Sequence, residues 1–247
     1  MRIIPVIDLM NGRVVRGVAG QRDSYQAVES AIAAEPTPTS VANALADRFG
    51  FDEVYVADLD AIGGLPLDQK SYEEVAASGM RLWLDAGITD AARAKTVLEI
   101  APENSHVVVG LESIASADDL QGVFSAIPGG RGVFSLDLKG GVPMANSTAW
   151  RRLDADDIAN TAIEAGFNRM IVLDLAYVGT GGGIGAGALC QRIRERFPDI
   201  ELISGGGVRD LQDLQKLKEC GCDAALVASA LHNAQLTADD VRTASKW

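Results

Sequence analysis

Eight short apolar runs rich in β-branched residues recur along the chain, and amphipathic helical stretches separate them. This alternation predicts parallel strands that are buried on both faces and joined by helical crossovers. The predicted strands are Arg2–Asp8, Glu53–Asp58, Arg81–Asp85, His106–Gly110, Gly132–Lys139, Arg169–Asp174, Ile200–Ser204 and Asp223–Ala228. Helices are expected to begin near Ser40, Asp68, Thr89, Ser116, Asp154, Gly187, Asp210 and Thr237.

Eight such units in 247 residues predict an α/β protein built as one (β/α)8 TIM barrel over residues 1–247. Internal similarity favours closure into a barrel, because the VADLDAIGG segment at Val56–Gly64 resembles the VLDLAYVGTGGG segment at Val172–Gly183. The IDL triplet at Ile7–Leu9 likewise matches LDL at Leu136–Leu138, which indicates a half-barrel repeat. The alternative is an open doubly wound sheet, but that fold usually has a glycine-rich turn after its first strand.

Composition narrows the function to small-molecule chemistry. The formal net charge of -12 disfavours binding to nucleic acid or to anionic membranes. The chain has no apolar run long enough to cross a bilayer, and its first apolar stretch stops at Asp8, so we expect a cytoplasmic protein. Cys220 and Cys222 match no common zinc pattern with His106 and His232, so neither a metal nor a cofactor is expected.

Residues 10–39 form an unusually long first βα connection. Val14 and Val15 lie between Gly12 and Gly17, a pattern that predicts a small hairpin. Because long loops in compact domains are usually functional, we expect a lid over the barrel mouth, with a disordered insertion as the alternative. Its arginines, Arg13, Arg16 and Arg22, are able to reach a phosphate from such a lid.

Five predicted strands carry a carboxylate at or near their carboxyl end: Asp8, Asp58, Asp85, Asp137 and Asp174. In a parallel barrel, these side chains would ring the mouth where active sites lie, although strand-end acids also commonly cap turns. Asp8 and Asp137 hold equivalent positions in the two halves. Facing each other across the mouth, they would form an acid–base pair. Lys139 follows on the same strand, where it would hold an anion, form a Schiff base or neutralise the acids.

Glycine-rich segments follow the last three predicted strands, at Gly179–Gly183, Ser204–Val208 and near Ala228. Glycines let backbone N–H groups approach a phosphate closely, and barrels often bind phosphate beyond strands seven and eight. A single cluster is weak support, since glycine is usually just a turn former. Three clusters together predict a phosphate site formed by Gly179, Thr180, Gly205, Gly206, Ala228 and Ser229.

These segments resemble the HisA/HisF family, the isomerase and cyclase of histidine biosynthesis. The resemblance rests on IPVIDLMNGRVVR, VYVADLD, SLDLKGG, ISGGGVRDLQDL and ALVASAL, which occur in the family's strand order over nearly the whole chain. The opening is more similar to HisA. By this resemblance the reaction would be an Amadori rearrangement of a phosphoribosyl aminoaldose, with Asp8 and Asp137 as base and acid.

The chain departs from the HisA pattern at several positions. Leu173 and Val178 replace a hydroxyl residue and a functional carboxylate, and Asp85 and Glu112 lie where the family binds a second phosphate. These changes predict a small, singly phosphorylated substrate. We therefore expect a HisA-like isomerase or lyase that handles a phosphosugar, and the resemblance extends to relatives associated with one-carbon cofactor biosynthesis. The alternatives are true HisA activity and a non-catalytic barrel that binds a phosphometabolite.

Overall fold

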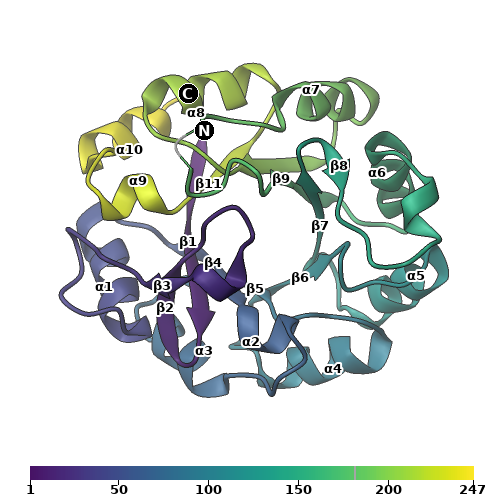
Figure 1. Cartoon of the computed structure of the whole chain (residues 1–247), viewed down its shortest axis with the longest axis horizontal. Coiled ribbons are helices and arrows are strands. Elements are labelled where there is room, and N and C mark those ends of the chain that lie inside the picture. The colour runs from purple at the N-terminus through teal and green to yellow at the C-terminus, as the bar shows by residue number, and fades with distance from the viewer. Residues whose placement is uncertain (181) are drawn as a thin grey trace.

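The computed structural model of the chain describes residues 1–180 and 182–247. Within these residues, eight parallel strands pair in a closed ring, which Figure 1 shows end-on. In ring order they are β1 (Arg2–Met10), β4 (Glu53–Asp58), β5 (Arg81–Asp85), β6 (His106–Gly110), β7 (Gly132–Lys139), β9 (Arg169–Asp174), β10 (Glu201–Gly205) and β11 (Ala224–Val227). Pairing of Ile3 with Ala225 closes the ring between β1 and β11. The predicted TIM barrel is therefore confirmed.

Helices cover the outside of the ring (Figure 1). They are α1 (Pro38–Phe49), α3 (Gln69–Ala76), α4 (Ala91–Ile100), α5 (Ala117–Ala126), α6 (Ala155–Glu164), α7 (Gly187–Arg196), α8 (Leu211–Glu219) and α10 (Ala238–Ala244). Most begin at a side-chain cap that accepts a first-turn N–H, as Asp68 does for α3 and Thr237 for α10. The helix starts predicted from these polar residues agree with the structure to within about two residues.

Apolar residues fill both sides of the sheet, which explains the continuous apolar runs. One cluster lies between strands and helices and includes Leu45 and Tyr72. A second cluster fills the barrel interior and includes Ile4, Trp83 and Ile203. Because both faces of each strand are covered, nearly every residue of β4 and β6 is buried.

The first βα connection begins with a hairpin on β1. Strand β2 (Arg13–Arg16) pairs antiparallel with β1 after a turn at Asn11 and Gly12, where both residues have positive φ angles. A short 3₁₀ helix, η1 (Arg22–Ser24), and strand β3 (Gln26–Ala27) follow. The predicted hairpin is confirmed. The pairing with β2 also extends β1 two residues beyond the predicted end at Asp8.

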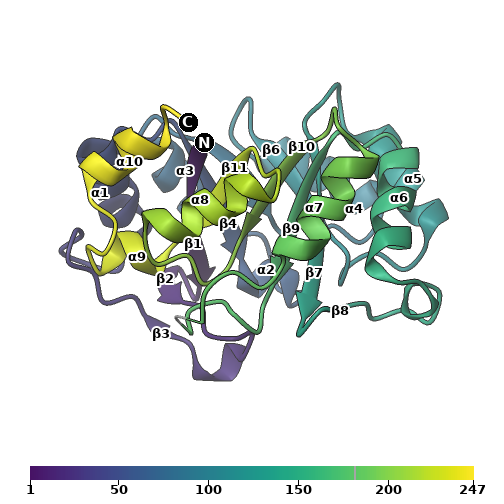
Figure 2. The ribbon, with the colours of Figure 1, turned by 90° about the horizontal axis from the view of Figure 1, so that it is seen from above.

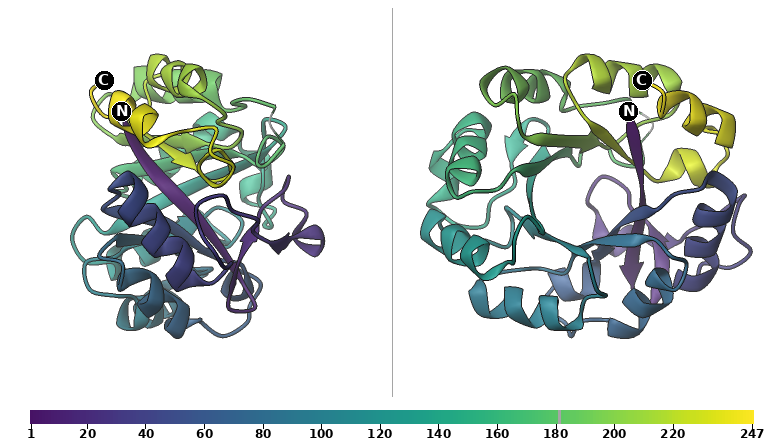
Figure 3. Two further views of the ribbon diagram at one scale, coloured as in Figure 1. Left: turned by 90° about the vertical axis from the view of Figure 1, so that its left-hand side faces the viewer. Right: turned by 180° about the vertical axis from the view of Figure 1, so that it is seen from behind.

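Short elements after several strands were not predicted: α2 (Leu59–Ile62), β8 (Val142–Pro143), η2 (Trp150–Arg152) and α9 (Ser229–His232). The first loop and β8 lie at one end of the barrel, and both termini lie at the opposite end (Figures 2 and 3). Among the helices of the described residues, none is long and apolar enough to cross a membrane.

Candidate active site

The carboxyl ends of the strands enclose a cavity of about 1100 Å³. Its lining comes from β1, β4, β5, β7, β9 and β11 and from the loops that follow them. Asp8 and Asp137, the predicted acid–base pair, both line this cavity. Asp85 and Glu112 also line the cavity. Four acidic side chains, from three strands and one loop, therefore face the same space.

Burial shifts the pKa values of the cavity carboxyls toward neutrality. It raises the pKa of Asp8 to about 6 and that of Asp137 to about 7. The charges of Asp85 and Glu112 also raise the pKa of Asp137, while Gly17 N–H and Arg22 act in the opposite direction on Asp8. Groups with pKa values near the working pH both accept and donate protons efficiently, as acid–base catalysis requires.

Hydrogen bonds hold these carboxyls in place. The Ser135 hydroxyl donates to Asp137 Oδ1 at 3.1 Å, and the Tyr55 hydroxyl donates to Asp85 Oδ2 at 3.1 Å. Tyr55 was not predicted as a site residue. It lies on β4 and faces the cavity, but no sequence motif marks it. Burial, followed by the charge of Asp85, raises the pKa of Tyr55, so its hydroxyl stays protonated and able to donate.

The remaining strand-end acids stabilise the backbone. Asp58 caps α2 by accepting the Ala61 N–H at 2.9 Å, and it also accepts the Tyr72 hydroxyl. Asp174 accepts the N–H groups of Gly140 and Gly141 at 2.9 and 2.8 Å. These two carboxylates play the turn-capping role that sequence reasoning offered as the alternative to catalysis.

The structure brings most of the predicted phosphate-binding residues together at the cavity wall, on the side away from Asp85 and Glu112. Those that line it are Gly179, Thr180, Gly206, Ala228 and Ser229. Gly205 is not in the lining, because it packs where a Cβ would lie 2.6 Å from the Leu226 carbonyl oxygen. Gly207, which was not predicted, lines the cavity, and Gly181 of the predicted glycine segment lies outside the described residues.

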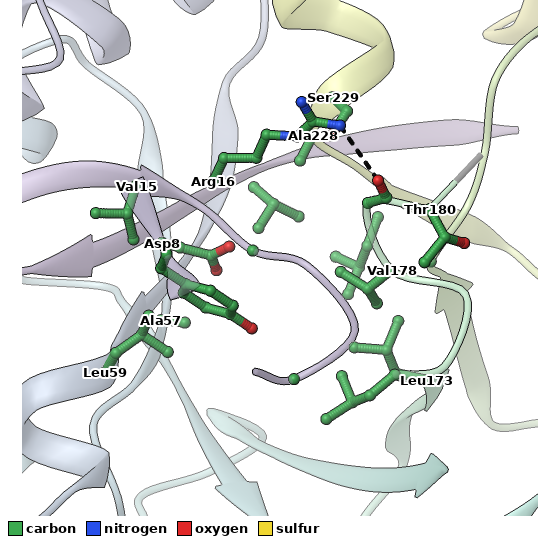
Figure 4. A pocket seen from close by; sticks show the side chains of 18 of the residues that line it. Asp8, Val15, Arg16, Ala57, Leu59, Leu173, Val178, Thr180, Ala228 and Ser229 are labelled. Carbon is green, nitrogen blue, oxygen red and sulfur yellow. Dashed lines mark hydrogen bonds between the residues drawn. The ribbon is translucent and has the colours of Figure 1, made fainter. Parts of the chain in front are cut away.

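Arg16, on β2, lies beside the part of the cavity wall formed by Gly179, Thr180, Gly206, Ala228 and Ser229, here called the glycine-rich side. Its guanidinium Nη2 donates to the Gly179 carbonyl oxygen at 3.2 Å, and Figure 4 shows it directed toward Ala228 and Ser229. An arginine placed beside glycine-rich loops and a serine side chain suits an anion. The guanidinium therefore supplies positive charge to this side of the cavity.

Lys139 does not reach the cavity. It is exposed at the end of β7, where it pairs with Val142 in the β7–β8 hairpin, and it is not among the lining residues. The sequence predicted that Lys139, two residues beyond Asp137 on the same strand, would share the face of Asp137. Instead, the turn at Gly140 and Gly141 carries the strand end out of the barrel.

The first loop crosses the barrel mouth and contacts two other loops. The Ala19 N–H donates to the Val178 carbonyl oxygen at 2.9 Å, and Arg22 Nη2 lies 2.7 Å from Glu112 Oε1. The first loop and the loop after β9 are packed closely together, because a Cβ added to Gly179 would lie 2.2 Å from the Gly17 carbonyl oxygen. These contacts join the loops that follow β1, β6 and β9.

Comparison with known proteins identifies the family. A family model described as "Histidine biosynthesis protein" matches residues 2–237. The chain belongs to this histidine biosynthesis protein family.

Several similar proteins match the chain over nearly all of its length. The "uncharacterized protein" MJ0703 of Methanocaldococcus jannaschii is 27% identical over 98% of this chain and 97% of its own. Two proteins named 1-(5-phosphoribosyl)-5-((5-phosphoribosylamino)methylideneamino) imidazole-4-carboxamide isomerase are also similar. The one from Xanthomonas euvesicatoria is 29% identical over 93% of each chain, and the one from Caldicellulosiruptor bescii is 28% identical over 98% of each.

The positions at which the sequence departs from the HisA pattern all face the cavity. Leu173 and Val178 line it beside the glycine-rich side, and Asp85 and Glu112 line it on the acidic side. His232 also lines the cavity, with its Nδ1 2.9 Å from the Ser30 hydroxyl. Burial lowers the pKa of His232 to about 4, so its ring is neutral near neutral pH. In this member of the histidine biosynthesis protein family, the changes therefore concern surfaces that a ligand would contact.

Proposed function

We propose that this chain is an acid–base isomerase that acts on a small, singly phosphorylated molecule. The observation that carries the proposal is that Asp8 and Asp137 line the same cavity as the glycine-rich loops and Arg16. In an isomerisation of this kind, one group removes a proton from carbon or oxygen and another returns a proton elsewhere in the molecule. The reaction therefore leaves the total proton count unchanged.

Asp8 is the proposed base and Asp137 the proposed acid. Asp8 has the lower pKa of the two, about 6 against about 7, so at a pH between these values Asp8 is mainly ionised while Asp137 mainly keeps its proton. The Ser135 hydroxyl occupies Asp137 Oδ1 and leaves Oδ2 for the substrate. This division supports the assignment of one role to each carboxyl.

The charge distribution supports one phosphate and not two. Gly206, Ser229 and Arg16 offer N–H, hydroxyl and guanidinium groups to an anion on one side of the cavity. On the other side, the negative charges of Asp85 and Glu112 would repel a second phosphate. Asp85 accepts a hydrogen bond from the Tyr55 hydroxyl, and Glu112 forms an ion pair with Arg22.

A second candidate is the imidazole-carboxamide isomerase activity for which the Xanthomonas and Caldicellulosiruptor relatives are named. The similarity over nearly the whole chain favours it. The acidic residues just described weigh against it, because that substrate carries two phosphoribosyl groups. A lyase using the same pair of carboxyls and a non-catalytic phosphate-binding barrel are the other outcomes that an assay must separate.

One experiment separates these outcomes. The purified wild type, Asp8→Asn and Asp137→Asn proteins are incubated in deuterated water with the imidazole-carboxamide aminoaldose and, separately, with a phosphometabolite extract. Deuterium incorporation or product formation is followed by NMR. Turnover of a singly phosphorylated compound by the wild type and not by the variants is expected. Efficient turnover of the aminoaldose instead supports the second candidate, and binding without exchange or conversion contradicts the proposal of an enzyme.

A further inference from the structure

Part of the floor of the cavity is apolar. The cluster that fills the barrel interior ends toward the cavity in four partly buried side chains: Val6, Leu59, Ile62 and Leu173. These side chains pack on the core below and present their upper surfaces to the cavity. Apolar surface left open in this way gains free energy when a ligand covers it.

Further apolar side chains continue the floor upward beside the glycine-rich side. A Cβ on Gly206 would lie 3.1 Å from Val178 Cγ2 and 3.2 Å from Leu173 Cδ1, so these two side chains adjoin each other at this loop. Leu175 and Met144 also line the cavity. The apolar surface therefore reaches the place where the proposed phosphate would be bound.

Figure 4 shows how this surface lies relative to the charged groups. Leu173 and Val178 lie on one side of the view and Leu59 and Ala57 on the other, with Asp8 near the latter and Arg16 beside Ser229 above. A molecule that extends from Arg16 between these two groups of side chains therefore lies against apolar surface for part of its length.

The chemistry of this surface discriminates between bodies of different polarity. Leucine and valine side chains neither donate nor accept hydrogen bonds, so hydroxyl groups of a sugar that face them would lose water without gaining a partner. An aromatic or aliphatic ring would instead bury apolar surface against apolar surface. The floor thus favours a ring without hydroxyls on the face that rests on it.

We propose that the substrate carries an apolar, ring-sized body between its phosphate and its reacting group, and that Leu173 and Val178 select for that body. This inference rests on the proposed function, because it takes the phosphate position and the acid–base pair as given. It replaces the phosphosugar expected from the sequence with a phosphorylated molecule of lower polarity.

Isothermal titration calorimetry with three probes tests the inference on the intact protein: benzyl phosphate, ribose 5-phosphate and inorganic phosphate. For the wild type, benzyl phosphate should bind about tenfold more tightly than ribose 5-phosphate, a difference of about 1.4 kcal/mol. Val178→Thr conserves side-chain shape and should weaken benzyl phosphate several-fold while leaving inorganic phosphate unchanged. Val142→Thr, at a valine that is 66% exposed on β8, is the matched control and should change neither.

The outcomes separate this inference from the function on which it rests. Equal binding of benzyl phosphate and ribose 5-phosphate, with inorganic phosphate still bound, overturns the apolar body and leaves the phosphate site standing. Failure of all three probes to bind overturns the phosphate site and the inference together. An equal loss of benzyl phosphate binding in Val178→Thr and Val142→Thr also overturns the inference, because the effect would then not come from the cavity.

Discussion

The carboxylates of Asp85 and Asp137 flank Gly110, with the Oδ2 atom of each 3.8 Å from the point where a Cβ on Gly110 would lie. Acids from β5 and β7 therefore lie close together beside the end of β6, the strand between them. The negative charge of Asp85 is, after burial, the largest cause of the raised pKa of Asp137. Asp85 therefore helps Asp137 to keep its proton near neutral pH.

Asp85→Asn should lower the pKa of Asp137, because the variant removes the neighbouring charge and conserves the side-chain shape. The Tyr55 hydroxyl retains an oxygen to which it donates. We expect the high-pH limb of the pH–kcat profile to move to lower pH. Tyr55→Phe is the control, since it removes that hydrogen bond without changing charge. A high-pH limb that stays in place in Asp85→Asn would show that the two carboxyls do not interact.

The wild-type enzyme should have a bell-shaped pH–rate profile with its maximum between about pH 6 and about pH 7. Activity should fall as Asp8 is protonated below its pKa of about 6, because a protonated base cannot accept a proton. It should fall again as Asp137 loses its proton above about 7. Asp8→Asn and Asp137→Asn should each reduce kcat by about 100-fold or more. A flat profile over this range contradicts the paired roles.

Most of the scaffold could be predicted from sequence because each strand is a local apolar run. β4, β5, β6, β7 and β9 have the predicted bounds, since both of their faces are buried and their ends are marked by charged or turn residues. β10 is shifted by one residue relative to the prediction, and β11 is one residue shorter at each end. Backbone pairing with neighbouring strands, which no local pattern encodes, decides those ends.

The site was harder to predict where its geometry depends on loops. Asp8 and Asp137 follow directly from strand position, and both line the cavity. Tyr55 has no motif, and its contact with Asp85 exists only because β4 and β5 are neighbours in the ring. Lys139 was misplaced because a two-glycine turn leads the chain away from the mouth, and alternation along a strand cannot reveal where the strand leaves the barrel.

Arg22 and Glu112 should shift the activity profile in opposite directions. The positive charge of Arg22 lowers the pKa values of Asp8, Asp85 and Asp137, so Arg22→Gln should move both limbs of the pH–rate profile to higher pH. Glu112 raises the pKa of Asp137, so Glu112→Gln should move the high-pH limb to lower pH. Both variants break the same 2.7 Å ion pair. Identical shifts in the two variants would mean that the broken pair, and not the charge near the carboxyls, causes the effect.

Asp137→Asn should stabilise the fold at high pH. The folded pKa of Asp137 is about 7 against an ordinary value of 3.8, so the folded state binds more protons between these values and stability falls as pH rises through them. Since one pKa unit corresponds to about 1.4 kcal/mol, removing the charge should add on the order of 4 kcal/mol to the free energy of unfolding near pH 8. The gain should vanish near pH 4. Urea denaturation at both pH values measures it, and an equal gain at both would exclude a charge effect.

Gly179→Ala should separate the first loop from the loop after β9. Gly179 has a φ angle of 68°, and its added Cβ would lie 2.2 Å from the Gly17 carbonyl oxygen, so one backbone segment must move. The hydrogen bonds that join the loops, from Ala19 to Val178 and from Arg16 to Gly179, would then be lost.

Gly140→Ala is the matched control for this variant. Gly140 has a φ angle of 60°, but a Cβ there would meet no atom within 4 Å, so the control shares the backbone strain of about 1 kcal/mol without the clash. We expect trypsin to cleave Gly179→Ala after Arg16 or Arg22 at least several-fold faster than Gly140→Ala, and kcat/KM to fall only in Gly179→Ala. Because the two variants differ in the contact and not in the strain, equal cleavage and equal activity would show that the first loop does not close the site through Gly179.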